Sequence, residues 1–154
     1  MKKILKLTMV LLGALFVLLG CSSEAKSEFV FEHNMGKQKI TYVYDKAKDS
    51  VTSLTFDISY DIANNKDMET QIRNLRESIV TEINGIEGVT VTQSDSEKEL
   101  KVTVAVDLKK FKYDDEEGRQ KAPSLYSSIH TALVKKNDIY SFEESKKSIL
   151  DEGF

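Results

Sequence analysis

Residues 100–108 have the sequence LKVTVAVDL, in which every second residue is leucine or valine and all but one of the residues between them are polar. Residues 54–60, LTFDISY, repeat the pattern, and residues 40–44, ITYVY, place one isoleucine and two tyrosines on a single face. Strict alternation is typical of a strand that buries one face and exposes the other to water. The three stretches therefore predict an antiparallel sheet that is covered on one side only.

Two shorter apolar stretches, residues 29–33 and 89–92, extend this prediction to about five strands. Turn-forming residues separate the strands at 34–36, 45–49 and 94–97. Consecutive strands usually lie side by side, so the first three strands and the last two are each expected to form a meander. How the two meanders join is left open by the pattern.

An amphipathic helix is predicted between the third and fourth strands. Its apolar side chains recur at helical spacing: Met68, Ile72, Leu75, Ile79 and Ile83. Two ion pairs at i,i+4 would support it, Glu69 with Arg73 and Arg73 with Glu77. Asn65 or Asp67 is expected to cap its first turn, and Gly85 to end it.

Two further helices are predicted near the C-terminus. One starts at Pro123-Ser124 and carries Leu125, Ile129 and Leu133 on one stripe. The other starts with a capping box at residues 141–144 and stops at Gly153. Residues 110–122 are interpreted as the one long loop. The fold class is therefore α+β, with two or three helices packed on one face of the sheet.

The first 21 residues have the pattern of an export signal. Lys2, Lys3 and Lys6 precede an apolar run from Met9 to Leu19, which is too short to span a bilayer as a helix. Leu18-Leu19-Gly20-Cys21 resembles the lipobox of bacterial lipoproteins, in which the peptide is cut before the cysteine and the thiol is acylated. The expected organisation is a signal peptide at 1–20, a lipidated tether at 21–27 and one domain at 28–154.

Composition narrows the functions that the chain can have. Removing the three N-terminal lysines from 22 Lys and Arg leaves 19 against 25 Asp and Glu, a net charge of −6, which disfavours nucleic-acid binding. A single cysteine excludes an intrachain disulfide, a CxxC redox pair and a four-thiolate zinc site.

Several features taken in order resemble the YehR-like family of small bacterial lipoproteins. They are the lipobox, the short tether, the strand Ile40-Thr41-Tyr42-Val43-Tyr44, the amphipathic helix, the turn Gly85-Ile86-Glu87-Gly88-Val89 and the terminal helix ending Gly153-Phe154. The family has no known function. The resemblance therefore implies the anchor and an α+β fold, and it assigns no catalytic residue.

The acidic loop is the candidate ligand or cation site. Asp114, Asp115, Glu116 and Glu117 could attract a cation, although four consecutive carboxylates cannot all point at one ion, and a solvated loop is the favoured interpretation. Tyr113, beside them in the predicted loop, is the tyrosine that could contact a ligand. The other tyrosines are expected in the core or at its rim.

The remaining motifs have structural explanations. His33 is expected at the rim of the sheet, and His130 on a helix has no i,i+4 ligand partner, so neither predicts a metal site. Gly85-Ile86-Glu87-Gly88 has the GxxG form of KH domains, but its central residues are not basic, so it is interpreted as a helix stop and a strand start.

These observations favour a non-enzymatic lipoprotein without a cofactor, anchored through Cys21 on the extracytoplasmic face of a cell membrane. Its domain would serve as an interaction or accessory module for an envelope protein. The alternative is a binder of a small ligand or cation in a pocket between helix and sheet, with residues 110–118 at its mouth.

Overall fold

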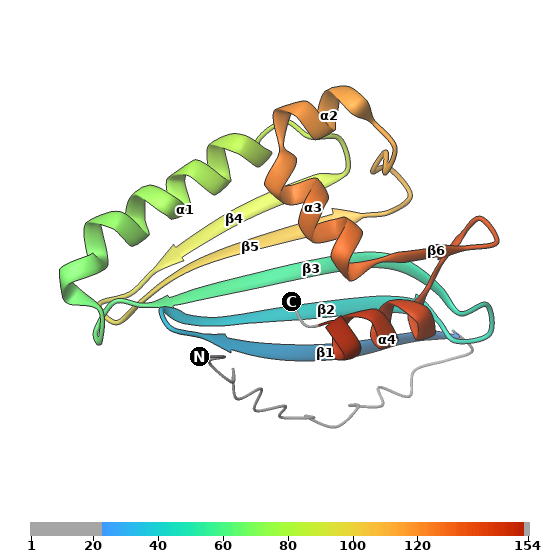
Figure 1. The fold of residues 1–154 in the computed structure, drawn as a ribbon, viewed down its shortest axis with the longest axis horizontal. Helices are drawn as coiled ribbons and strands as arrows, with labels where there is room; N and C mark the ends of the chain where they lie inside the picture. Colours follow the sequence, from blue (N-terminus) through green and yellow to red (C-terminus); the bar gives the residue numbers. More distant parts are fainter. Residues whose placement is uncertain (1–22, 153–154) are drawn as a thin grey trace.

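The computed structural model describes residues 23–152 as a sheet with helices on one face (Figure 1). Along the chain the elements are β1 (Glu24–His33), β2 (Gly36–Asp45), β3 (Ser50–Asp61), the 3-10 turn η1 (Lys66–Met68), α1 (Glu69–Ile83), β4 (Val89–Asp95), β5 (Glu99–Asp107), α2 (Glu116–Lys121), α3 (Pro123–Ala132), β6 (Val134–Lys136), β7 (Ile139–Ser141) and α4 (Phe142–Glu152). The predicted α+β fold is confirmed.

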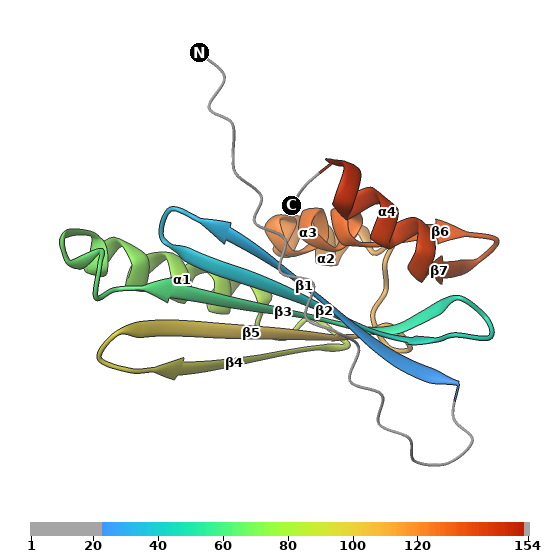
Figure 2. The same ribbon diagram turned by 90° about the horizontal axis from the view of Figure 1, so that it is seen from below.

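The sheet has the order β1-β2-β3-β5-β4, and every pair in it is antiparallel. The two predicted meanders join where β3 pairs with β5, with Phe56 opposite Val104. The short hairpin β6–β7, which the sequence did not predict, attaches to β3 through Ser50 and Ser141. Figure 2 shows the four helices on the same side of a strongly twisted sheet.

The core lies between that face and the helices, as the alternation predicted. The alternating apolar residues of β3 and β5 are buried or nearly so, with Leu54, Leu100 and Val102 fully enclosed. Phe142 at the start of α4 stacks on Tyr44 at 3.7 Å between ring centroids. The Tyr42 hydroxyl donates a hydrogen bond of 2.6 Å to the Ala132 carbonyl, which ties β2 to the end of α3.

The opposite face of the sheet is polar and carries a row of charges across four strands. Lys39 lies 3.6 Å from Glu28 and 3.4 Å from Asp57, and Lys101 reaches the same Asp57 at 3.5 Å. Thr103 donates a 2.6 Å hydrogen bond to that carboxylate. Burial acts to raise the pKa of Asp57, but the Thr103 hydrogen bond and the two ammonium groups together hold it below its usual value.

Two sequence predictions about segments are corrected, and a third lies outside the described residues. The predicted tether, residues 21–27, is mostly strand, because Glu24–Ser27 pair with Asp45–Tyr42 of β2. The predicted loop 110–122 contains α2, whose first turn holds the acidic residues 116 and 117. The signal peptide and Cys21 lie outside the described residues, so the predictions for them stand as predictions.

The predicted helix caps are partly right. Neither Asn65 nor Asp67 makes a side-chain capping bond, whereas Gly85 follows α1 at a φ of 81° and ends it as expected. At α4 the Ser141 hydroxyl accepts the Glu144 amide at 3.2 Å, as the capping box predicted. Asp49 adds a cap from outside the helix, because its carboxylate accepts the Glu143 amide at 3.0 Å.

Candidate functional site

A small cavity lies between α1, α3 and the covered face of the sheet. Its volume is about 100 Å³, and six of its lining side chains are apolar: Phe56, Ile58, Ile79, Ile83, Val104 and Leu125. Four polar residues from three elements complete it: Gln38, Glu82, Ser124 and Ser128. An apolar cavity with a few polar groups is the usual form of a binding pocket.

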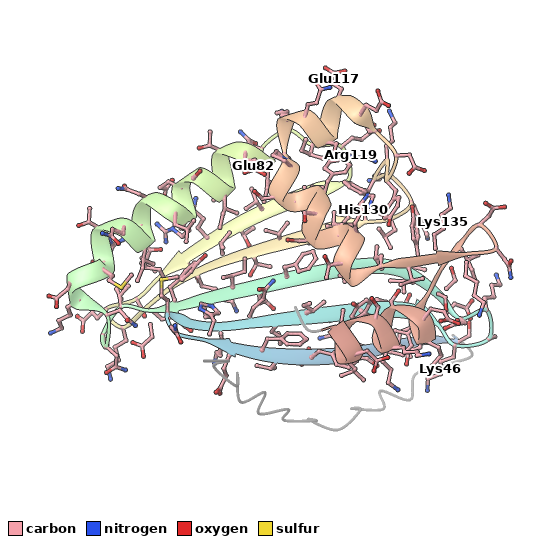
Figure 3. The ribbon with its side chains drawn as sticks, viewed as in Figure 1. Lys46, Glu82, Glu117, Arg119, His130 and Lys135 are labelled. Atoms are coloured by element: carbon pink, nitrogen blue, oxygen red, sulfur yellow. The ribbon has the colours of Figure 1, made fainter. Side chains whose placement is uncertain are left out.

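Glu82 joins the two helices beside this cavity. Its carboxylate accepts the Ser124 amide at 2.9 Å and the Ser124 hydroxyl at 3.3 Å, so a side chain of α1 caps the first turn of α3 (Figure 3). An anion is favourable at a helix N-terminus, where backbone amides lack partners and the helix dipole is positive. The cap therefore fixes the distance between the helices that flank the cavity.

The apolar stripe of α1 continues beyond the cavity onto the surface. Leu75 is 43% exposed and Met68 38% exposed, although the periodicity predicted both in the core. Leu75 lies one helical turn from Ile79, which lines the cavity, so these side chains share one flank of α1. The cavity and the exposed side chains on this flank of α1 are taken together as one candidate site, called the α1 groove below.

The other flank of α1 is held to the edge strand β4 by charges. Arg76 is only 6% exposed, and its guanidinium donates to the Asp95 carboxylate and, at 3.1 Å, to Glu77. Arg73 reaches the same Asp95 at 3.2 Å and also pairs with Glu69 at 2.8 Å. The predicted pair Glu69–Arg73 is confirmed. The predicted pair Arg73–Glu77 is wrong, because Arg73 binds Asp95 on β4.

Arg76 is a buried charged residue that was not predicted, although its position in the sequence indicates burial. It lies on the buried stripe of α1, four residues after Ile72 and three before Ile79, where a charged residue is unusual. Within residues 23–152 its Nε has no hydrogen-bond partner. Its two other nitrogens bind carboxylates, so the cluster is best explained as the contact that fixes α1 over β4.

The Asp95 contacts predict a pH dependence of stability. The Arg76 hydrogen bond, followed by the charges of Arg76 and Arg73, holds the pKa of Asp95 below its usual value. A carboxylate with a lowered folded-state pKa stabilises the fold above its unfolded pKa of about 3.9 and loses that contribution as the pH falls through the folded value. We expect the free energy of unfolding, measured by urea titration, to fall in acid less steeply in Asp95→Asn than in the wild type.

The control for this prediction is Glu97→Gln, in the exposed β4–β5 turn, which should leave the acid slope unchanged. Asp57 and Glu28 also have lowered pKa values, so Asp95→Asn should remove only part of the slope. An unchanged slope in Asp95→Asn would contradict the contact with Arg76.

The predicted acidic loop does not bring its four carboxylates together. Asp115 and Glu117 line a cavity of about 210 Å³ beside Gly85, with Lys112 and Lys121. Asp114 and Glu116 are exposed outside that lining. Between residues 23 and 152, no three His, Cys, Asp or Glu side chains form a group that could hold a metal ion.

Tyr113 lies in an aromatic cluster. Its ring stacks on His130 at 4.1 Å and lies 5.3 Å from Tyr140. Its hydroxyl reaches the Leu133 carbonyl at 3.5 Å, and burial raises its pKa. Tyr113 is thus half-buried and connects the loop to α3 and β7. It is not part of the lining of either cavity described above.

Solved structures share this architecture. The NMR structure of the E. coli YehR protein matches with a TM-score of 0.65 and 18% identity, covering 88% of this chain and 91% of that one. The chain has the YehR fold. The NMR structure of a protein from Streptococcus pneumoniae TIGR4 matches with a TM-score of 0.55 and 15% identity, over 92% of each chain. The sequence matches no family model and no curated protein.

The resemblance predicted from the sequence is therefore confirmed for the fold. At identities of 18% and 15%, the likeness to these structures assigns no role to any residue of this chain. The evidence for the α1 groove is therefore the geometry of this chain alone. None of the helices between residues 23 and 152 has the length and hydropathy that a membrane span requires.

Proposed function

We propose that this protein is a lipid-anchored extracytoplasmic module that binds an envelope protein, without catalytic activity of its own. In this proposal the α1 groove receives an apolar side chain of the partner. The observation that carries the proposal is that the exposed Leu75 and Met68 lie on the same flank of α1 as Ile79, which lines the cavity. Contiguous apolar surface that leads into a pocket is typical of protein interaction sites.

The size of the cavity favours a side chain over a larger ligand. Pockets for drug-sized molecules have volumes of roughly 300–1,000 Å³. An engineered apolar cavity of about 150 Å³ in another protein binds benzene. A cavity of about 100 Å³ suits one aliphatic or aromatic group, which a partner can insert while its neighbouring residues contact Leu75 and Met68.

The site can be tested by photo-crosslinking in native membranes. We expect a photoreactive residue at position 75 to capture a discrete partner, whereas one at Thr81, exposed about 120° away around α1, should not. Equal capture from both positions would contradict a site at the α1 groove.

A matched pair of substitutions on α3 gives a second test. Ser128 lines the cavity, and its neighbour Ser127 is exposed. We expect Ser128→Trp to fill the cavity and abolish the crosslink from position 75, while Ser127→Trp preserves it. Both variants are compared at equal folded concentration, checked by circular dichroism. Full crosslinking in Ser128→Trp would show that the cavity is not used.

The second candidate function is binding of a small ligand or cation. The observation that favours it is the cavity of about 210 Å³ where Asp115 and Glu117 face Lys112 and Lys121. Native mass spectrometry of the protein extracted gently from its own membranes tests it. A reproducible added mass, lost in Asp115→Asn, would favour this second function.

The anchor has its own prediction. Acylation requires the thiol of Cys21, so Cys21→Ser should leave the precursor uncleaved and without acyl chains. Mass spectrometry of the detergent-extracted protein measures both properties. Normal cleavage of Cys21→Ser, with release from the membrane, would contradict the lipoprotein assignment.

A further inference from the structure

One end of the domain collects three chain segments. The start of β1, the β2–β3 turn and the β6–β7 hairpin lie together at this end in both views (Figures 1 and 2). Two contacts hold them there. The Lys46 amide donates a 2.8 Å hydrogen bond to the Ser23 carbonyl, and Ser50 pairs with Ser141. The chain therefore enters the fold directly beside these two turns.

The connection from Cys21 to this end is very short. Ser23 is already bonded to the β2–β3 turn, and at about 3.4 Å per residue the two steps from Cys21 to Ser23 span at most about 7 Å. The six polar residues 22–27 of the predicted tether, if extended, would have allowed about 20 Å. Acyl chains on Cys21 would thus hold this end of the domain against the lipid headgroups.

The exposed residues of the two turns suit a membrane surface. Ile139, at the start of β7, is an apolar side chain that is 36% exposed. Four exposed lysines lie in the same two segments, the β2–β3 turn and the β6–β7 hairpin: Lys46, Lys48, Lys135 and Lys136 (Lys46 and Lys135 are labelled in Figure 3). The carboxylates of Asp45, Asp49, Asp138 and Glu144 lie at the same end.

Neighbouring carboxylates are already engaged in the fold. Asp45 accepts the amide of Ala47 at 2.9 Å and lies 4.0 Å from the Lys48 ammonium group. The Asp49 carboxylate accepts hydrogen bonds from the Ser141 hydroxyl and from the Glu143 amide. Glu144 binds Lys136 at 2.5 Å. In both ion pairs the lysine side chain is the more exposed partner, 78% against 24% for Lys48 and Asp45 and 57% against 39% for Lys136 and Glu144, so ammonium groups project from this end.

We propose that this end is a membrane-contact surface. Ile139 inserts at the boundary between headgroups and acyl chains, and the lysines contact the phosphates of anionic lipids. Lysines near an anionic leaflet are attracted to it, and their apolar stems lie along the interface while the ammonium groups stay hydrated. The inference rests on the lipid anchor of the proposed function.

The proposal fixes how the domain is oriented. β1 has ten residues, so at about 3.3 Å per residue the β1–β2 turn lies roughly 33 Å from the membrane end. Met68 precedes α1 shortly after the far end of β3. The exposed part of the α1 groove would then face away from the bilayer, where a partner protein can reach it.

Depth-dependent fluorescence quenching tests this orientation on the full acylated protein. Acylation blocks the thiol of Cys21, so a fluorophore attaches only to an introduced cysteine. Ile139→Cys reports on the membrane end, and Asn34→Cys, exposed in the β1–β2 turn, is the matched control. In phosphatidylglycerol vesicles with quencher-labelled lipid we expect strong quenching at position 139 and none at position 34.

The charge contribution is tested separately with paired variants. Lys46→Gln with Lys135→Gln should lose the increase in quenching at position 139 on going from phosphatidylcholine to phosphatidylglycerol vesicles. Lys37→Gln with Lys98→Gln, both exposed at the far end, should keep it.

The outcomes separate the two proposals. A mature mass without acyl chains overturns the anchor and the membrane-contact surface together. An acylated protein with equal quenching at positions 139 and 34, or stronger quenching at 34, overturns the contact surface while the anchor stands. Quenching at 139 that does not depend on anionic lipid overturns the role of the lysines.

Discussion

Val104→Asp is expected to unfold the domain. Val104 is 2% exposed and lies in the middle of β5, with Phe56 opposite it on β3 and Val91 opposite it on β4. A carboxylate there would lose its hydration without gaining a cation or a donor, a change in the class that destabilises by more than about 4 kcal/mol. Small domains are stable by only about 5–15 kcal/mol. Circular dichroism during thermal or urea unfolding measures the effect.

The matched control is Thr90→Asp, one strand away on the open face of the sheet. Thr90 is exposed and pairs with Ala105, so the same new charge stays in water. We expect a change within about 0.5 kcal/mol for this variant. A Val104→Asp protein that unfolds at the wild-type midpoint would contradict the position of β5 in the sheet.

The sheet could be predicted because the pattern that defines it is local. A strand with one covered face must alternate, and Leu54, Phe56, Val102 and Val106 are buried where the alternation placed them. The pairing of β3 with β5 could not be predicted in the same way. A helix separates the two meanders in the sequence, so the pattern does not show which edge of the first meander the second one joins. The residues of β3 and β5 do not indicate which strand each pairs with.

The elements that were missed are short and depend on tertiary contacts. α2 has six residues, too few for a helical period to be recognised, and it packs through Gly118 against the Tyr126 hydroxyl. β6 and β7 have three residues each and turn through Asn137 and Asp138, both at positive φ. Asn and Asp tolerate that conformation, so this pair was an available turn signal.

The candidate site was predicted only in outline. A pocket between helix and sheet was expected, but its polar residues come from α1, α3 and β2, which are far apart in the chain. The capping of α3 by Glu82 depends on how two helices cross, and a sequence pattern does not contain that angle. The acidic loop, which was expected at the mouth of this pocket, borders the second cavity instead.

Gly88→Ala is expected to destabilise the protein much more than Gly85→Ala. Both glycines have a left-handed backbone, with φ of 78° and 81°, so each substitution carries a similar strain of about 1–2 kcal/mol. Their surroundings differ. A Cβ on residue 88 would lie 2.5 Å from the Phe111 amide nitrogen and 2.9 Å from the Lys110 carbonyl carbon, whereas one on residue 85 would meet only the flexible end of Lys121, at 3.3 Å.

The extra effect should come from displacement of the backbone at Phe111. That ring is buried and lies 5.0 Å from the Tyr126 ring, while the Gly88 carbonyl accepts the Asp107 amide at 2.8 Å. Relieving the clash must therefore disturb either an aromatic contact or the end of β5, which we expect to add about 1–3 kcal/mol. Urea unfolding of both variants gives the difference, and amide chemical shifts of Phe111 report its origin. The contrary result is equal destabilisation by the two substitutions, with the Phe111 amide shift unchanged in Gly88→Ala. It would mean that backbone strain alone accounts for both effects, and that Gly88 and Phe111 do not approach this closely in solution.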